Sequence, residues 1–146
     1  MKFRTTIAVA IVLMFAAAVS AQQNSPEQEI TNTVLNYAEG WYEGDAGRME
    51  KSLHPELAKR RIDTNAEGRS RMDEMSSLRL VQVTRPGYGK NTPKAEQMKT
   101  VKILDIYGDM ATVRLEMRDW IDYMHLAKTD GQWKIVNVLW DRKPGN

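Results

Sequence analysis

Two histidines are the residues of this chain best suited to acid–base chemistry. His54 stands before a proline at an expected helix end, where its imidazole could bind a ligand or transfer a proton near neutral pH. It could equally cap that helix, because a cationic side chain is favoured near helix carbonyls. His125 shares one face of an expected strand with Tyr123. Since Met124 and Leu126 on the other face are equally apolar, parity leaves open which face points inward.

Aromatic side chains are abundant, with four tryptophans in the chain. Tyr37 and Trp41 are one helical turn apart and share a helix face, whereas Trp120, Trp133 and Trp140 belong to the last expected strands. Indole and phenol rings stack on flat ligands and also form hydrogen bonds. We therefore predict ligand contacts from Tyr37, Trp41, His54, Trp120, Tyr123 and His125. The alternative is that the rings only fill the core. Trp133 and Trp140 have opposite parity, so at most one should face a cavity.

Several other kinds of site lack the residues they need. A metal centre needs three or four ligands at workable spacing, whereas the two histidines lie far apart, cysteine is absent and the carboxylates are scattered. No nucleophile motif and no phosphate-binding glycine loop is present. We expect no metal and no cofactor. Asp119 and Asp122 are interpreted as turn and edge residues, and the basic run 59–61 as a solvated face or a gate for an anionic ligand.

The first half of the chain carries helix signals. Ser25 can cap a helix that Pro26 begins, and Gly44 is a natural stop. Asp45 can cap a second, shorter helix that carries Met49 and Leu53 and ends before Pro55. A third helical piece is expected over 67–77.

The second half changes to the period of strands. We expect a short strand over 78–84, a long loop over 85–99, and hairpins formed by 101–107 with 110–118 and by 121–128 with 133–140. Helices followed by a meander predict an α+β fold. Three N-terminal helices should pack on a strongly curved antiparallel sheet of four long strands and one short strand.

Several stretches resemble a known family. Residues 120–128 and 130–140 are similar to the C-terminal signature of the "putative lumazine-binding" proteins, members of the nuclear transport factor 2-like superfamily. Residues 37–41, 53–60 and 101–108 resemble its first helices and its long strand, and only the loop 85–99 departs. The resemblance implies a cone with a cavity between helices and a curved sheet. The outer face of that sheet is often a dimer contact in the superfamily, which implies a homodimer.

The N-terminus has the plan of a cleavable signal peptide over residues 1–21. Two basic residues precede an apolar run at 5–19, which is shorter than the roughly 20 residues that span a bilayer. Small residues at 19–21 suit cleavage before Gln22. We therefore expect export to the periplasm or outside the cell, with residues 22–146 as one domain that has no membrane attachment. The precursor has 21 basic and 19 acidic residues, and losing Lys2 and Arg4 makes the net charge zero, which argues against a nucleic-acid partner.

The leading functional hypothesis is a non-catalytic, exported binder of a small aromatic or heterocyclic molecule. The superfamily also contains isomerases, dehydratases and hydrolases, so its fold constrains function weakly. A cofactor-free enzyme of one of these types, with His54 or a cavity aspartate as general base, is the first alternative. A dimeric structural module whose cavity is filled by its own tryptophans is the second.

Overall fold

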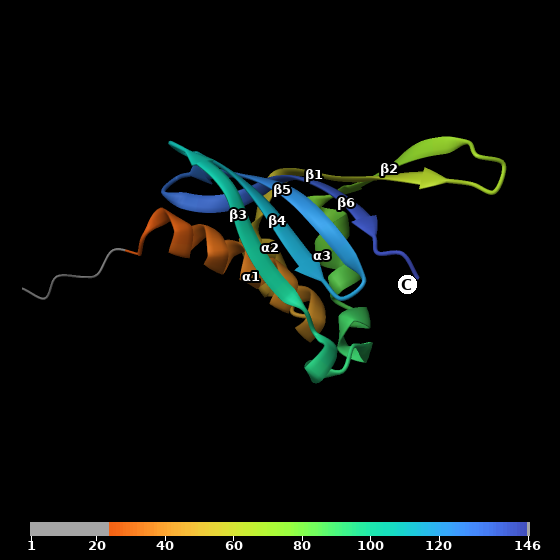
Figure 1. Cartoon of the computed structure of the whole chain (residues 1–146). Coiled ribbons are helices and arrows are strands. Elements are labelled where there is room, and N and C mark those ends of the chain that lie inside the picture. Colours follow the sequence, from red (N-terminus) through yellow and green to blue (C-terminus); the bar gives the residue numbers. More distant parts are fainter. Residues whose placement is uncertain (1–23, 146) are drawn as a thin grey trace, which may run out of the picture.

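The computed structural model describes residues 24–145, so the expected signal peptide lies outside the described residues. Three α-helices lie against a curved six-stranded sheet (Figure 1). The helices are α1 Pro26–Glu43, α2 Ala46–Ser52 and α3 Ser77–Thr84. The strands are β1 Leu53–Thr64, β2 Ser70–Ser76, β3 Lys99–Tyr107, β4 Met110–Met117, β5 Trp120–Thr129 and β6 Gln132–Arg142. Within residues 24–145, no helix has both the length and the apolar character needed to cross a membrane.

The predicted caps of the first two helices are confirmed. The Ser25 hydroxyl accepts a hydrogen bond from the Gln28 backbone N–H at 3.3 Å, and α1 ends at Gly44, whose φ of 62° is left-handed. The Asp45 carboxylate accepts one from the Arg48 N–H at 3.0 Å. Helix α2 stops at Ser52, so Leu53 already belongs to a strand. The short connection places α1 and α2 side by side beneath the sheet.

The predicted elements between 53 and 84 are wrong. The expected helix over 67–77 is mostly strand β2, the expected strand over 78–84 is helix α3, and strand β1 was not predicted at all. Strand β2 pairs with β1 in antiparallel orientation. The paired stretch begins with Ala58 opposite Ser76 and ends with Thr64 opposite Ser70. The Ser76 hydroxyl then caps α3 by accepting from the Arg79 N–H at 3.3 Å. Pairing with a partner strand therefore overrides the weak local preference of this segment.

The sheet is mixed, which corrects the prediction of a purely antiparallel one. Its strand order is β2-β1-β6-β5-β4-β3, and β1 runs parallel to β6 while every other neighbouring pair is antiparallel. Both predicted hairpins, β3–β4 and β5–β6, are present. The distal part of β1 and strand β2 project from the body as an arm (Figure 1). The expected loop over 85–99 contains two short 3₁₀ helices, Tyr88–Asn91 and Lys94–Glu96.

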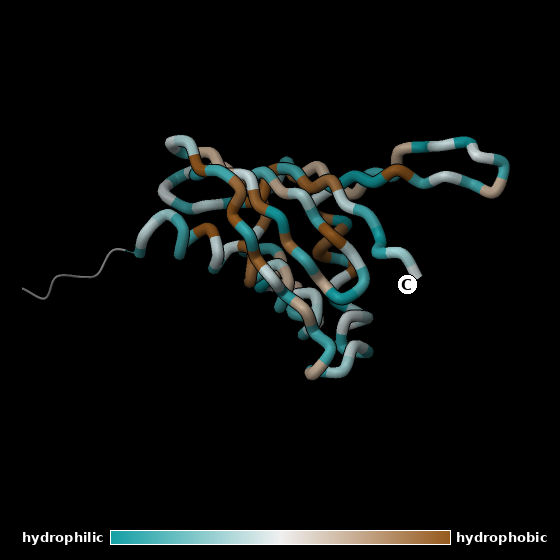
Figure 2. The backbone as a smooth tube through the Cα atoms, in the orientation of Figure 1, coloured by the Kyte–Doolittle hydropathy of each residue, from teal (hydrophilic) through white to brown (hydrophobic). Residues whose placement is uncertain are grey.

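The core lies between α1 and the inner face of the sheet. Apolar and polar residues alternate along the strands (Figure 2), so one face of each is buried. The fully buried side chains of this layer come from the first helix and the central strands: Ile30, Val34, Val113, Leu115, Met117, Met124, Ile135 and Val138. A bulge in β6 between Ile135 and Asn137 reverses the parity of that strand. This packing leaves open the other end of the space between helices and sheet.

Candidate functional site

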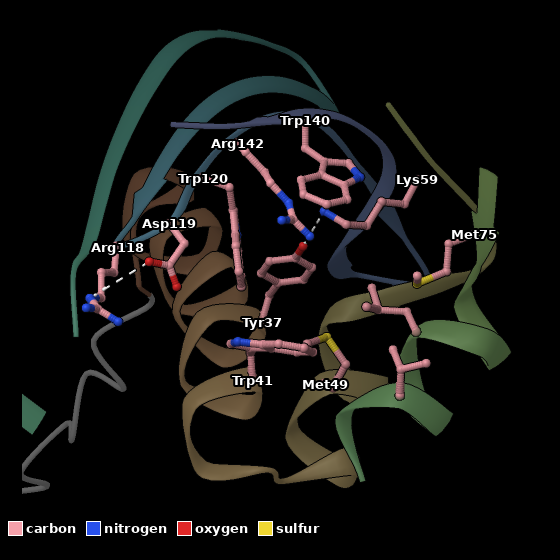
Figure 3. A pocket seen from close by; sticks show the side chains of 12 residues that line it. Tyr37, Trp41, Met49, Lys59, Met75, Arg118, Asp119, Trp120, Trp140 and Arg142 are labelled. Atoms are coloured by element: carbon pink, nitrogen blue, oxygen red, sulfur yellow. Dashed lines mark hydrogen bonds and ion pairs between the residues drawn. The ribbon is translucent and has the colours of Figure 1, made fainter. Parts of the chain in front are cut away.

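A cavity of about 540 Å³ opens between the three helices and the sheet, where it is lined by residues of β1, β2, β5 and β6 and of the turn between β4 and β5. Its volume lies within the range of about 300–1,000 Å³ that is typical of small-molecule sites. Most of its wall is apolar or aromatic, and a few charged groups reach it (Figure 3). The lining residues are Tyr37, Trp41, Met49, Lys59, Met75, Leu80, Val83, Arg118, Asp119, Trp120, Trp140 and Arg142.

Three tryptophans form the aromatic wall of the cavity. Trp41 comes from α1 and contacts Trp120 of β5 edge to face, with ring centroids 5.5 Å apart and an angle of 75° between the planes. Trp120 contacts Trp140 of β6 in the same way, at 6.1 Å and 71°. Tyr37 stands between them, one turn before Trp41 on α1 (Figure 3). Each ring is held by another ring, so the wall is a preformed stacking surface for a flat ligand.

A buried ion pair supports the inner end of the cavity. The Lys59 ammonium donates to Asp122 Oδ1 at 2.6 Å and to the Tyr37 hydroxyl at 2.8 Å. The Lys59 and Asp122 side chains are only 7% and 0% exposed. Asp122 Oδ2 is also buried, and no residue within 24–145 donates a hydrogen bond to it. Lys59 and Tyr37 thus reach the cavity, whereas Asp122 lies behind them.

Burial sets the protonation of this cluster. Desolvation raises the pKa of Tyr37 well above its usual range, and the negative charge of Asp122 raises it further, so the phenol stays neutral. Desolvation lowers the pKa of Lys59, although the attraction of Asp122 opposes that shift. The Lys59 ammonium also lies 4.6 Å from the ring centroid of Trp140 and 5.5 Å from that of Tyr37. These cation–π contacts add to the support of the charged form.

Charged groups surround the mouth of the cavity. Arg118 pairs with Glu96 at 2.9 Å and with Asp119 at 3.8 Å. The guanidinium of Arg142 extends inward past Trp140 (Figure 3), and no carboxylate within residues 24–145 forms an ion pair with it. Arg142, an exposed residue at the end of β6, is therefore a lining cation whose charge no carboxylate of the described residues neutralises. In the same part of the chain, His, Asp and Glu side chains form no cluster that could hold a metal ion.

The structure brings together only part of the predicted ligand-contacting set. Tyr37, Trp41 and Trp120 line the cavity, as drawn in Figure 3. Tyr123 and His125 are exposed on the outer face of the sheet, which answers the question that parity left open. The His54 ring accepts a hydrogen bond from the Glu56 N–H at 3.2 Å and does not line the cavity. Any role of these last three in binding stays a prediction.

Sequence reasoning missed several lining residues. The sequence places Lys59 in a basic run, because strand β1 is not predicted. The buried positions Leu57 and Lys59 alternate along β1, and that spacing is the signal that could have identified the strand. Trp133 and Trp140 do not lie on opposite faces as their spacing predicts, because the β6 bulge turns both inward. Trp133 packs in the core and only Trp140 lines the cavity, so the prediction that at most one of them faces it is confirmed. Asp122, interpreted as an edge residue, is fully buried. An aspartate flanked by apolar residues in a central strand was a sign that it has a buried partner.

Solved structures with the same fold come from several bacteria. A nuclear transport factor 2-like protein of unknown function from Shewanella baltica superposes with a TM-score of 0.65 at 19% identity, over 84% of this chain and 99% of that one. A nuclear transport factor 2-like protein of unknown function from Silicibacter pomeroyi superposes with a TM-score of 0.58 at 17% identity, over 79% of this chain and 93% of that one. A nuclear transport factor 2-like protein with a cystatin-like fold from Novosphingobium aromaticivorans has a TM-score of 0.59 at 12% identity, over 82% of this chain and 83% of that one. At these identities the likeness establishes the fold alone.

The family assignment comes from the sequence match. No curated protein matches this chain. Residues 25–141, which include all of the described helices and nearly all of the sheet, match the family described as "Putative lumazine-binding". The chain therefore belongs to the "Putative lumazine-binding" family and has the nuclear transport factor 2-like cone fold.

Proposed function

We propose that this chain is an exported domain that binds a small aromatic or heterocyclic molecule in its cavity without transforming it. The observation that carries the proposal is the wall of Trp41, Trp120 and Trp140 around a space of about 540 Å³. A flat ligand would stack on rings that are already held in place, so little ordering would be needed on binding. The family's description as lumazine-binding, which names a flat heterocycle, agrees with this proposal.

Binding without catalysis is favoured by the state of the titratable groups. Neither histidine lines the cavity, and Asp122 is fully buried behind its contact with Lys59. Tyr37 is held neutral, and its hydroxyl accepts a hydrogen bond from Lys59. A general base needs a free lone pair within reach of the proton that it removes. The groups at the inner end of the cavity are already engaged with one another.

A cofactor-free enzyme is the second candidate, because one carboxylate does line the cavity. Asp119 lies at the mouth, 3.8 Å from Arg118 Nε, where it could accept a proton from a bound molecule. Once a ligand is known, NMR in D₂O would detect its turnover or proton exchange. If Asp119→Asn abolishes such turnover, the protein is an enzyme; an unchanged ligand supports the binding role.

The ligand can be identified by incubating the domain 22–146 with a bacterial metabolite extract and analysing the complex by native mass spectrometry. We expect one bound small molecule that absorbs in the near ultraviolet. Trp120→Ala should lose it, because the central ring of the wall is removed. Tyr88→Ala, which changes an exposed ring that does not line the cavity, is the matched control and should retain it. An empty domain at saturating extract concentrations would contradict the proposal.

Export is tested separately on the full chain. Expressed in a Gram-negative bacterium, it should appear in the periplasm or medium with the mass of residues 22–146. Lys2 and Arg4 supply the positive charge before the apolar run, so replacing both by Glu should slow processing and retain the precursor in the cell. Quantitative retention of the wild-type full-length mass in the cytoplasm would contradict export.

A further inference from the structure

We infer that the ligand of this cavity carries an acidic group on its flat ring system, and that Arg142 binds this group. The inference rests on the proposed function and narrows its ligand class. Arg142 lies opposite Trp120 in the β5–β6 register, and both side chains line the cavity. A ligand stacked on the tryptophan wall would therefore have its edge beside a guanidinium.

The charge balance of the cavity supports an anion. Its lining contains the three cations Lys59, Arg118 and Arg142, but a single acid, Asp119. The charge of Lys59 is matched by Asp122, and Arg118 pairs with Glu96 and Asp119. The charge of Arg142 has no such match within residues 24–145. A guanidinium is always charged and presents a planar fork of donors that fits a carboxylate or an ionised heterocycle.

A cationic ligand is the obvious competitor, because boxes of aromatic rings often bind ammonium groups. In this cavity the protein's own cations already use the Trp140 ring. Lys59 Nζ lies 4.6 Å from its centroid and Arg61 Cζ lies 5.0 Å from it. A further cation would have to share this ring with them and would be repelled by the unmatched charge of Arg142. Both of the cations already on the ring are paired with carboxylates, so it is the charge of Arg142 that attracts an anion.

Three naphthalene probes of matched size separate the alternatives: 2-naphthoate, 2-naphthamide and 2-naphthylmethylammonium. Isothermal titration calorimetry on the domain 22–146 should rank naphthoate first, at least about tenfold tighter than naphthamide, with the ammonium weakest. Arg142→Gln should bring naphthoate to the affinity of naphthamide and leave naphthamide unchanged. Arg79→Gln removes an exposed arginine of α3 that does not line the cavity and should preserve the ranking.

The outcomes distinguish this inference from the proposed function. Equal binding of all three probes, or preference for the ammonium, overturns the acidic ligand while retaining an aromatic-binding cavity. Preference for naphthoate that survives in Arg142→Gln overturns the assignment of Arg142. Arg142→Lys checks the geometry of the contact, since it keeps the charge but loses the planar fork and should recover only part of the preference. If none of the probes binds, the proposed function fails and this inference fails with it.

Discussion

The ammonium of Lys59 lies 2.6 Å from Asp122 Oδ1, and the two side chains are only 7% and 0% exposed. They come from β1 and β5, two strands that are separated in the sheet by β6. The pair therefore spans the inner face of the sheet beneath Trp140, and Tyr37 links it to α1. The pair thus joins two strands across β6, and the hydrogen bond from Lys59 to Tyr37 ties α1 to the sheet at the inner end of the cavity.

Removing one member of this pair should destabilise the domain strongly. Lys59→Met leaves the Asp122 carboxylate buried without a counter-ion, at a cost of about 3–5 kcal/mol in the free energy of unfolding. The double variant Lys59→Met/Asp122→Leu leaves no buried charge and should recover most of that loss. Urea denaturation measures all three proteins. As a control, Arg60→Ala breaks the exposed Arg60–Glu74 pair and should cost less than about 1 kcal/mol.

Two results would contradict the role of the Lys59–Asp122 pair. One is a loss below about 1 kcal/mol in Lys59→Met, which would mean that Asp122 finds water or another partner when Lys59 is gone. The other is a double variant that is less stable than Lys59→Met alone. That result would mean that Lys59 and Asp122 contribute through packing rather than through their charges.

The neutral phenol of Tyr37 predicts a loss of stability in alkali. In the unfolded chain Tyr37 ionises near its usual pKa of about 10, whereas in the fold its pKa is well above that value. The contribution of the Tyr37 phenol to the free energy of unfolding is therefore complete below about pH 10. It is lost as the pH rises further, because the unfolded chain then releases a proton that the native state retains. The lowered pKa of Lys59 acts in the opposite direction, but it is present in every variant compared here.

The measurement is urea denaturation between pH 8 and 11.5. Tyr37→Phe has no phenol to ionise, so its stability should fall less steeply above pH 10 than that of the wild type. Tyr88→Phe removes a phenol that is 63% exposed and should follow the wild-type curve. Parallel curves for Tyr37→Phe and wild type would show that Tyr37 ionises equally easily in the folded and unfolded chains.

Two helical glycines should respond in opposite ways to alanine. A Cβ on Gly40 would lie 2.9 Å from the Met49 backbone nitrogen and 3.2 Å from the Asp45 carbonyl oxygen, so α1 and α2 must separate. We expect Gly40→Ala to lower the thermal midpoint and cost about 1–3 kcal/mol. Gly47→Ala meets only Asp45 Oδ1 at 3.4 Å and should be neutral or stabilising by up to about 1 kcal/mol. Equal effects of the two changes would refute the close approach of the helices.

The parts of the fold that could be predicted from sequence are those set by local chemistry. The Ser25 and Asp45 caps depend on side chains within three residues of the N–H groups that they bind. The hairpin turns at 108–109 and 130–131 use residues that tolerate positive φ, as found at Gly108, Asp130 and Gly131. Each of these signals is complete within a few residues, so no knowledge of the tertiary structure is needed.

The errors arise where distant pairing decides the structure. Strand β1 carries Lys59, Arg61 and Asp63 at alternate positions. Because these positions are charged, the sequence lacks the apolar alternation that predicts a strand, and pairing with β2 and β6 stabilises β1 instead. Lys59 can be buried only because Asp122 lies 63 positions further along the chain. The β6 bulge, which places Trp133 and Trp140 on one face, follows from register with β5. The positions of Lys59, Trp140 and Arg142 in the cavity lining depend on these long-range features.

A homodimer through the outer face of the sheet is the last prediction. Tyr123 and Leu139 lie opposite each other in the β5–β6 register, and each is 51% exposed on this face. Adjacent large apolar side chains on a sheet surface favour association, so light scattering should give about twice the monomer mass. Leu139→Glu should shift the mass to that of the monomer. Leu78→Glu, which adds the same charge at a 68% exposed position of α3, should leave the dimer intact. A monomer at about 100 μM wild-type protein, or equal dissociation by both changes, would show that this face is not the interface, because charge added away from the sheet has no reason to separate copies joined through it.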